Sequence, residues 1–160
     1  MRKFCILLLM FLILLSIAVC SNAEMAETEL VNKNASQVVF SSLQDGKYTA
    51  YASDKDTIAL MGWRDYMIIN VEGGAITDIQ IDSLNSTGDL KSQISKSQYP
   101  MTPHPSEWLP ELIKQATEAA KGEDIDGITG ATISSNAVRN MFDALLEAAA
   151  SGNTQAIQTK

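Results

Sequence analysis

The residues best suited to carry chemistry lie in one short segment, Asp124-Ile-Asp-Gly-Ile-Thr-Gly-Ala-Thr-Ile-Ser-Ser135. Gly127 and Gly130 allow backbone angles that other residues avoid, and they let a ligand approach the main chain closely. An apolar pattern with helical spacing starts at the end of this segment. Three hydroxyl groups lie in or just before the first turn of this expected helix, on Thr132, Ser134 and Ser135.

The start of a helix is a favourable place for a phosphate group. Its first four amides have no partners inside the helix, and the helix dipole is positive there. Hydroxyl groups beside such a start therefore indicate phosphate binding. The same residue types also fit a structural interpretation, because a Ser or Thr before a helix commonly caps it. The residues alone leave both interpretations open.

The run from Asp126 to Thr132 resembles the signature of the FMN-binding domain family, which has an acidic residue, two variable positions, Ser or Thr, and then Gly-Ala-Thr or Gly-Ala-Ser. Every position of the run matches. The family includes flavin subunits of sodium-pumping NADH:quinone oxidoreductases and Rnf complexes, and small lipoproteins of extracellular electron transfer. A looser similarity to these lipoproteins covers residues 43–150, most clearly at Trp63-Arg-Asp-Tyr66, Gly74-Ala-Ile-Thr77 and Gly88-Asp-Leu-Lys-Ser92.

The resemblance implies a covalent cofactor. In this family a flavin transferase moves FMN from FAD onto the last hydroxyl of the motif, which is Thr132 here. The remaining residues of the implied cofactor site are Asp126, Gly127, Thr129, Gly130, Ala131, Ser134 and Ser135. The protein is then a redox carrier and not an enzyme. Its implied partners are the flavin transferase, a membrane respiratory donor and an external electron acceptor.

Two other functions are weighed beside electron carriage. A binding or surface lipoprotein of the same fold without flavin is the first alternative. A self-sufficient flavin reductase is disfavoured, because no nicotinamide-binding fingerprint is present. No catalytic acid–base set and no metal-ligand spacing is recognised; Asp54, Asp56 and Asp65 are interpreted as a solvated face.

A few aromatic residues and one histidine have side chains that can serve a flavin site. Aromatic rings stack well on a flavin ring, although packing in the core or at its rim is the commoner role. The lone histidine, His104, is interpreted as an incidental surface residue. The aromatic candidates are Trp63, Tyr66, Tyr99 and Trp108.

The N-terminus has the features of an export signal: Arg2 and Lys3 precede an apolar run from Phe4 to Val19. A retained membrane anchor is the alternative. Cleavage before Cys20, in a lipoprotein-like box that Val19 weakens, leaves a cysteine to carry lipid. Cleavage before Glu24 follows the ordinary small-residue rule instead. Both sites place the mature domain outside the cytoplasm and leave it without a disulfide.

The mature chain is acidic. Removing the first 23 residues takes two of the 12 basic residues and none of the 19 acidic ones, so the net charge changes from −7 to −9. This charge argues against binding to nucleic acid or to an anionic lipid surface.

Periodicity predicts a small α+β domain over residues 44–150, after a signal over 1–23 and a spacer over 24–43, and before a loose tail over 151–160. An antiparallel sheet with helices on one face is expected. A hairpin turns at Gly73-Gly74 and has a bulge near Ile76. The expected strands are 48–51, 66–72 and 75–84; the expected helices are 90–95, 107–121 and 133–150, with Gly152 ending the last.

Overall fold

The computed structural model describes residues 43–99 and 101–160. The expected export signal, its two cleavage sites with Cys20, and all of the spacer except Leu43 lie outside the described residues. Within the described part of the chain, no helix is both long enough and apolar enough to cross a membrane.

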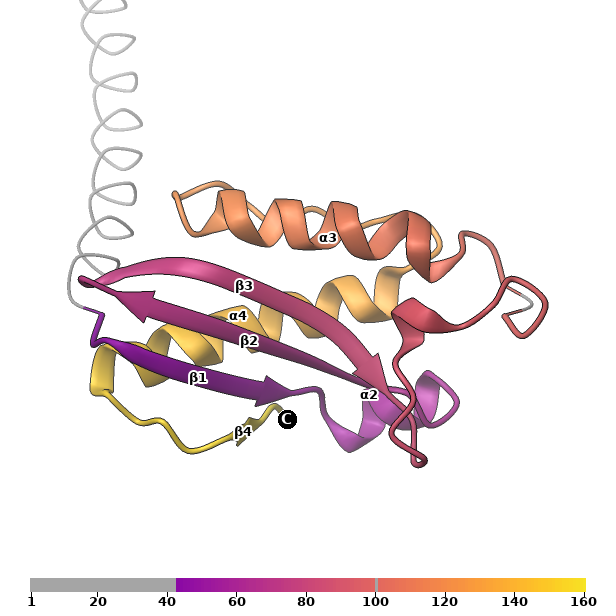
Figure 1. The fold of residues 1–160 in the computed structure, drawn as a ribbon, viewed down its shortest axis with the longest axis horizontal. Helices are drawn as coiled ribbons and strands as arrows, with labels where there is room; N and C mark the ends of the chain where they lie inside the picture. The colour runs from indigo at the N-terminus through magenta and orange to yellow at the C-terminus, as the bar shows by residue number, and fades with distance from the viewer. Residues whose placement is uncertain (1–42, 100) are drawn as a thin grey trace, which may run out of the picture. The chain divides into compact units, whose positions relative to one another are not determined.

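A sheet of three antiparallel strands and one short parallel strand forms one layer of the domain (Figure 1). The antiparallel strands are β1 (Gly46–Tyr51), β2 (Arg64–Glu72) and β3 (Ala75–Leu84). The fourth strand, β4 (Ile157–Gln158), runs parallel to β1, so the order across the sheet is β3-β2-β1-β4. The predicted α+β class is confirmed, and β4 makes the sheet mixed.

The C-terminal tail departs from its prediction. Residues 151–160 were expected to be loose, but β4 pairs with the end of β1, and the Thr159 amide donates to the Tyr51 carbonyl at 2.9 Å. A two-residue strand has too short a pattern to be recognised in a sequence, because its pairing depends on an edge built from the other end of the chain.

The β2–β3 hairpin agrees with its prediction. Gly73 and Gly74 form the reversal with φ values of 62° and 78°, angles that favour glycine. The register shifts next to Asn70, so that Thr77 has no partner residue across the strands. This bulge explains why Ile76 is out of phase with the rest of its strand.

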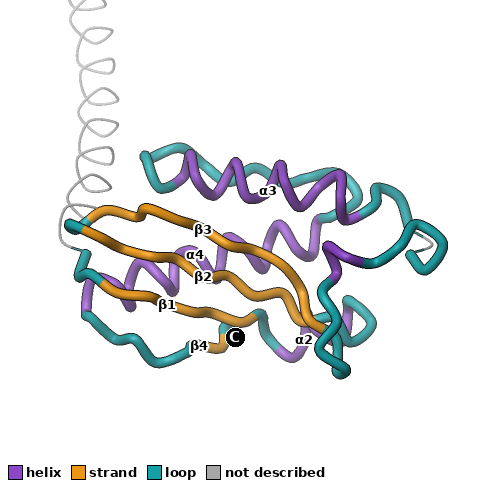
Figure 2. Tube along the Cα trace, in the orientation of Figure 1, coloured by secondary structure: helices purple, strands orange, loops and turns teal. Residues whose placement is uncertain are grey.

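Two long helices, α3 (Pro105–Ala119) and α4 (Thr132–Ser151), pack on the same face of the sheet (Figures 1 and 2). Each helix begins and ends within two residues of its prediction. Gly152 ends α4 in the left-handed conformation with φ 70°, as the sequence indicates. Two short helices, α2 (Asp54–Ala59) and the 3-10 turn η1 (Lys91–Gln93), flank one end of the sheet.

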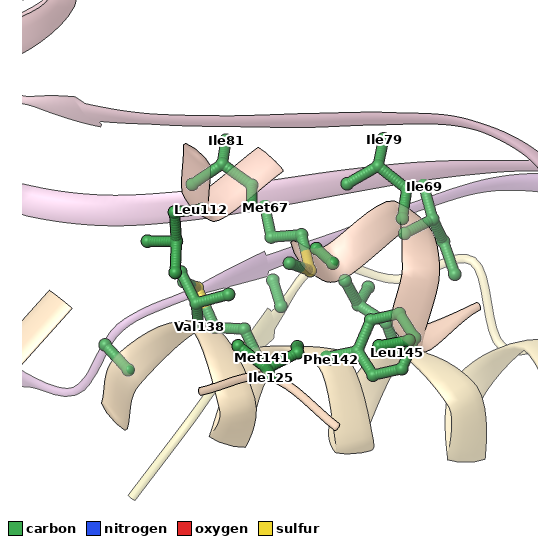
Figure 3. Packing of buried hydrophobic residues seen from close by; sticks show 14 of the residues in the cluster. Met67, Ile69, Ile79, Ile81, Leu112, Ile125, Val138, Met141, Phe142 and Leu145 are labelled. Atoms are coloured by element: carbon green, nitrogen blue, oxygen red, sulfur yellow. The ribbon is translucent and has the colours of Figure 1, made fainter. Parts of the chain in front are cut away.

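The hydrophobic core lies between the sheet and these two helices (Figure 3). Strands β2 and β3 contribute alternate residues from one face, and α4 contributes residues one turn apart, because side chains repeat every second residue in a strand and about every fourth in a helix. Figure 3 shows Met67, Ile69, Ile79 and Ile81 opposite Val138, Met141, Phe142 and Leu145, with Leu112 of α3 beside them.

Helix α3 starts earlier than predicted because His104 caps it. The His104 Nδ1 atom accepts a hydrogen bond from the Ser106 amide at 3.3 Å, and Pro105 occupies the first helical position, which suits a proline. His104 is 8% exposed, so its interpretation as an incidental surface residue was wrong. Pro110 consequently lies inside α3 and not in the first turn.

Two further local features were missed. Helix α2 has no buried residue, and therefore gives no apolar periodicity to read from the sequence. Leu43, expected to be the last residue of the spacer, is 6% exposed and belongs to the core. The folded domain therefore includes Leu43.

Truncating Leu43 tests this correction. Leu43→Ala should lower the free energy of unfolding by about 2–3 kcal/mol, because it removes a buried side chain and leaves a cavity. Ile58→Ala is the matched control: Ile58 is 78% exposed, so its loss should change stability by less than about 0.5 kcal/mol. Urea denaturation measures both variants. Equal stability of the two would place Leu43 outside the core.

Candidate functional site

The start of α4 lacks the side-chain cap that most helices have. Ala131 occupies the N-cap position, and no side chain forms a capping hydrogen bond there. Thr132, Ser134 and Ser135 all lie within the first helical turn, so none of them is the N-cap residue. The capping interpretation of this hydroxyl cluster is therefore wrong. The first-turn amides, which no helix can satisfy from within, remain available to a ligand.

The loop before α4 is fastened to the helix by two side chains. The buried Ser135 hydroxyl donates to the Ala131 carbonyl at 2.9 Å and accepts from the Ile128 amide at 3.1 Å. Arg139 donates from Nε to the Ile125 carbonyl at 2.7 Å. These bonds tie Ile125 and Ile128 of the loop to α4 and so constrain the backbone before Thr132.

Gly130 is the one motif position where close packing requires glycine. Its φ is 85°, in the left-handed region, and a Cβ atom there would lie 2.3 Å from Pro103 Cδ. The connection before α3 therefore packs directly against the motif at Gly130, and Gly130 itself lines a pocket.

The pocket opens at the N-terminus of α4 and has a volume of about 240 Å³. The motif and the helix start form one wall through residues 130–134, and the end of α2 with the residues after it forms another. The remaining lining comes from η1, α3 and the connection between them: Lys91, Tyr99, Met101 and Trp108.

A buried ion pair lies against this pocket. Asp65 on β2 and Lys91 in η1 each have a side chain only 2% exposed, and their Oδ1 and Nζ atoms are 3.8 Å apart. The Ser83 hydroxyl donates a short hydrogen bond to the same Asp65 oxygen, whereas Oδ2 has no hydrogen-bond partner among the described residues. Lys91 Nζ also lies 5.5 Å from the ring centre of Trp63 and 5.8 Å from that of Trp108.

Burial and ion pairing shift the pKa values of Asp65 and Lys91 in opposite directions. Burial raises the pKa of Asp65, while Lys91 and the Ser83 hydroxyl act to lower it. Burial lowers the pKa of Lys91, while Asp65 and Asp82 act to raise it. Each charge therefore depends on its partner, because an unpaired ion in this environment is strongly disfavoured. The earlier interpretation of Asp65 as part of a solvated face was wrong.

The structure brings together only some of the residues that the sequence indicates. Gly130, Ala131, Thr132 and Ser134 line the pocket. Ser135 is fully buried, and both of its hydrogen bonds hold the loop, so it positions the motif without lining the pocket. The other motif residues, Asp126, Gly127 and Thr129, are exposed on the preceding loop.

Only two of the four aromatic candidates line the same pocket as Thr132. Tyr99 and Trp108 line the pocket with Thr132. Trp63 lines a neighbouring pocket of about 480 Å³. Tyr66 instead pairs with Tyr51, their ring centres 6.4 Å apart, and lines neither of these pockets.

Lys91 and Asp65 were not identified as site residues from the sequence. Lys91 is part of the Gly88–Ser92 segment that is similar to small lipoproteins, but nothing in its own neighbourhood indicates burial. Within the described chain, no cluster of three or more His, Cys, Asp or Glu side chains could hold a metal ion.

Comparison with known proteins shows which family the chain belongs to. The FMN-binding domain model matches residues 62–147, which include β2, β3, α3, the motif and most of α4. The chain belongs to the FMN-binding domain family. This result confirms the resemblance that the Asp126–Thr132 motif indicates.

Two relatives agree with the family match. A 15 kDa lipoprotein of Treponema pallidum (strain Nichols) is 32% identical over 122 residues, which cover 74% of this chain and 84% of the relative. A Clostridium perfringens protein of known crystal structure has a TM-score of 0.63 and 31% identity. That comparison covers 74% of this chain and 99% of the other.

The residues of the pocket fit FMN. The uncapped amides at the start of α4 suit its phosphate. Trp108 lines the pocket, and its buried Nε1–H has no acceptor among the described residues, so an oxygen or ring nitrogen of a flavin can satisfy it. Burial raises the pKa of the neighbouring Tyr99, and the Trp108 indole acts to lower it, although the two side chains form no hydrogen bond.

The close packing at Gly130 can be tested by comparing the stability of two glycine-to-alanine variants. Gly130→Ala should destabilise the protein by more than Gly122→Ala, because both glycines have positive φ but only Gly130 has a neighbour in the way. The backbone strain costs about 1–2 kcal/mol at either position. The clash with Pro103 adds roughly 1–3 kcal/mol at Gly130. Urea denaturation compares them; equal losses would mean that Pro103 does not pack on the motif.

The ion pair gives a second test, which depends on pH. Lys91→Met leaves the Asp65 carboxylate buried without a cation and should cost about 3–5 kcal/mol at pH 7. Without Lys91 the pKa of Asp65 rises further above its unfolded value of about 3.9. A raised pKa favours folding below that unfolded value, and the advantage is lost as pH rises through the folded pKa. The deficit relative to the wild type should therefore shrink as pH falls toward about 4.

Replacing both partners is the control. Lys91→Met/Asp65→Asn should recover much of the stability at pH 7 and should not show the pH-dependent deficit, because the carboxylate that Lys91 pairs with is also removed. Urea denaturation from pH 4 to 7 measures this. A deficit in Lys91→Met that is constant over the range would contradict the pairing.

Proposed function

We propose that this protein is an exported lipoprotein that carries FMN as a phosphoester on Thr132 and relays electrons at the outer side of the cytoplasmic membrane. The observation that carries the proposal is the position of Thr132. It is the first residue of α4, exposed, at an uncapped helix start that opens onto the pocket. A phosphate esterified to its oxygen would lie beside the free amides of that turn.

The chemistry of attachment follows from the family. The Thr132 hydroxyl gives up its proton to solvent as its oxygen attacks the FMN phosphorus of FAD. A phosphoester forms, the pyrophosphate bond breaks, and AMP leaves. As in other members of the family, a separate flavin transferase performs this step. The exposed loop supports this assignment, because Asp126, Thr129 and Thr132 are all accessible to a second protein.

The motif residues take different roles in this proposal. Asp126 and Thr129 lie on the exposed loop and do not line the pocket, so we assign them to recognition by the transferase. Gly130, Ala131 and Ser134 line the pocket, where they would contact a bound cofactor. Ser135 and Gly127 shape the loop: the first bonds it to α4, and the second lies against the Arg139 guanidinium.

The location rests on the N-terminal sequence and on one relative. The Ile17–Cys20 box resembles a lipoprotein cleavage site, and a similar protein is described as a 15 kDa lipoprotein. We therefore favour cleavage before Cys20 and lipid attachment there. A covalent flavin suits a protein outside the cytoplasm, because a dissociable cofactor would diffuse away.

Electron carriage is the function that such a protein can serve. When bound, FMN supplies the redox chemistry, and the protein places and tunes it. The donor is a respiratory component of the membrane, and the acceptor is a soluble external oxidant. Reduction should accordingly be fast with membranes that hold the donor and slow with NADH alone.

Substitution of Thr132 tests the attachment. Thr132→Ala should abolish flavin fluorescence of the denatured protein produced with its transferase, because the acceptor hydroxyl is gone. Thr132→Ser is the matched variant and should retain flavin. Both should fold with stability within about 0.5 kcal/mol of the wild type, because Thr132 is exposed and makes no capping bond. Flavin that persists in Thr132→Ala would show that another residue is the acceptor.

A further inference from the structure

The buried cation Lys91 faces the same pocket as Thr132. Its side chain is 2% exposed overall, yet it lines the pocket together with Thr132 and Trp108. Its contact with Asp65 is 3.8 Å long, which exceeds the length of a hydrogen bond, so the ammonium protons remain available to another acceptor. A ring bound in this pocket would therefore meet a cation that has little competition from water.

The surroundings of Lys91 fix the position of its charge. The side chain is 2% exposed, and its ammonium lies 5.5 Å from the ring centre of Trp63 and 5.8 Å from that of Trp108. Aromatic faces attract cations, and this attraction is larger where water is excluded. Asp65 holds the charge from the side of the sheet and is itself fixed by the Ser83 hydroxyl.

We propose that Lys91 is the fixed positive charge of the flavin pocket, held in place by Asp65, and that it favours the reduced flavin by attracting the negative charge which reduction adds. This inference rests on the proposed function. Two electrons from a donor and one proton from solvent leave the flavin ring with one negative charge. Lys91 keeps its proton throughout. Asp65 is a positioning residue, because it does not line the pocket.

The charges around Lys91 are consistent with this role. The carboxylates that act on it are Asp65 of β2 and Asp82 of β3, and both favour its protonated form against the effect of burial on its pKa. A charge fixed before the reaction stabilises a developing opposite charge without reorganising solvent. In a partly buried site this effect is larger than in water.

The midpoint potential of the attached flavin is the first test, measured by dithionite titration of the flavin absorbance. Lys91→Met should shift the potential to a more negative value. Lys91→Arg, which keeps the charge, should stay close to the wild type. Lys96→Met is the matched control, because Lys96 is on the same connection but is exposed and pairs with Glu107 on the surface. It should leave the potential unchanged.

Sulfite binding is a second readout that needs no partner protein. The sulfur lone pair forms a bond to N5 of the oxidised flavin ring and leaves a negative charge on the ring, which bleaches its visible absorbance. The affinity for sulfite should fall roughly tenfold or more in Lys91→Met, since removing a nearby charge in a low-dielectric site costs at least that factor. The affinity for sulfite should stay close to the wild-type value in Lys91→Arg and in Lys96→Met.

The double variant Lys91→Met/Asp65→Asn is the folding control, because it removes both members of the ion pair and leaves no unpaired carboxylate at position 65. This variant should also show a more negative potential and weaker sulfite binding than the wild type, because only Lys91 lines the pocket. Unchanged potential and sulfite affinity in folded, flavinylated Lys91→Met or in the double variant would overturn the inference. A wild-type protein without covalent flavin would instead refute the proposed function, and the inference with it.

Discussion

The buried ion pair between Asp65 and Lys91 is the interaction on which the arrangement of the site depends. Asp65 comes from β2 and Lys91 from η1, and their contacts reach β3 through Ser83 and α3 through Trp108. Two buried charges are tolerated only when they stay together, since either one alone carries a large desolvation cost. The elements that form the pocket must therefore assemble around this pair. The same constraint places a cation beside the helix start where the motif ends.

The hydroxyl groups of the motif region look alike in the sequence but have different roles in the structure. Ser135 is buried and fastens the loop, whereas Thr132 is exposed at the first helical position. Ala131 at the N-cap leaves the first-turn amides without the internal partner that a Ser or Thr there would supply. Helix α4 therefore lacks a stabilising N-cap. Such a departure from a local stability rule is expected at a functional site.

The sequence pattern predicted the elements whose formation depends on neighbouring residues, namely the hairpin and the two long helices. The β2–β3 hairpin was recognised because strand alternation and Gly73-Gly74 agree, and the long helices because their apolar spacing is clear. Features that depend on distant partners were missed: β4 needs the edge of β1, and the burial of Asp65 needs Lys91. In the site, the motif indicated the family, but an aspartate next to an arginine looks like a surface residue until the structure shows its buried partner.

The central claim is a covalent flavin on Thr132, and peptide mass spectrometry of the protein from its native host tests it most directly. Trypsin cleaves after Lys121 and Arg139, so one peptide, residues 122–139, contains the whole motif. This peptide should gain the mass of FMN less one water, and fragmentation should assign the addition to Thr132. An unmodified peptide, or an addition at Thr129 or Ser134, would contradict it.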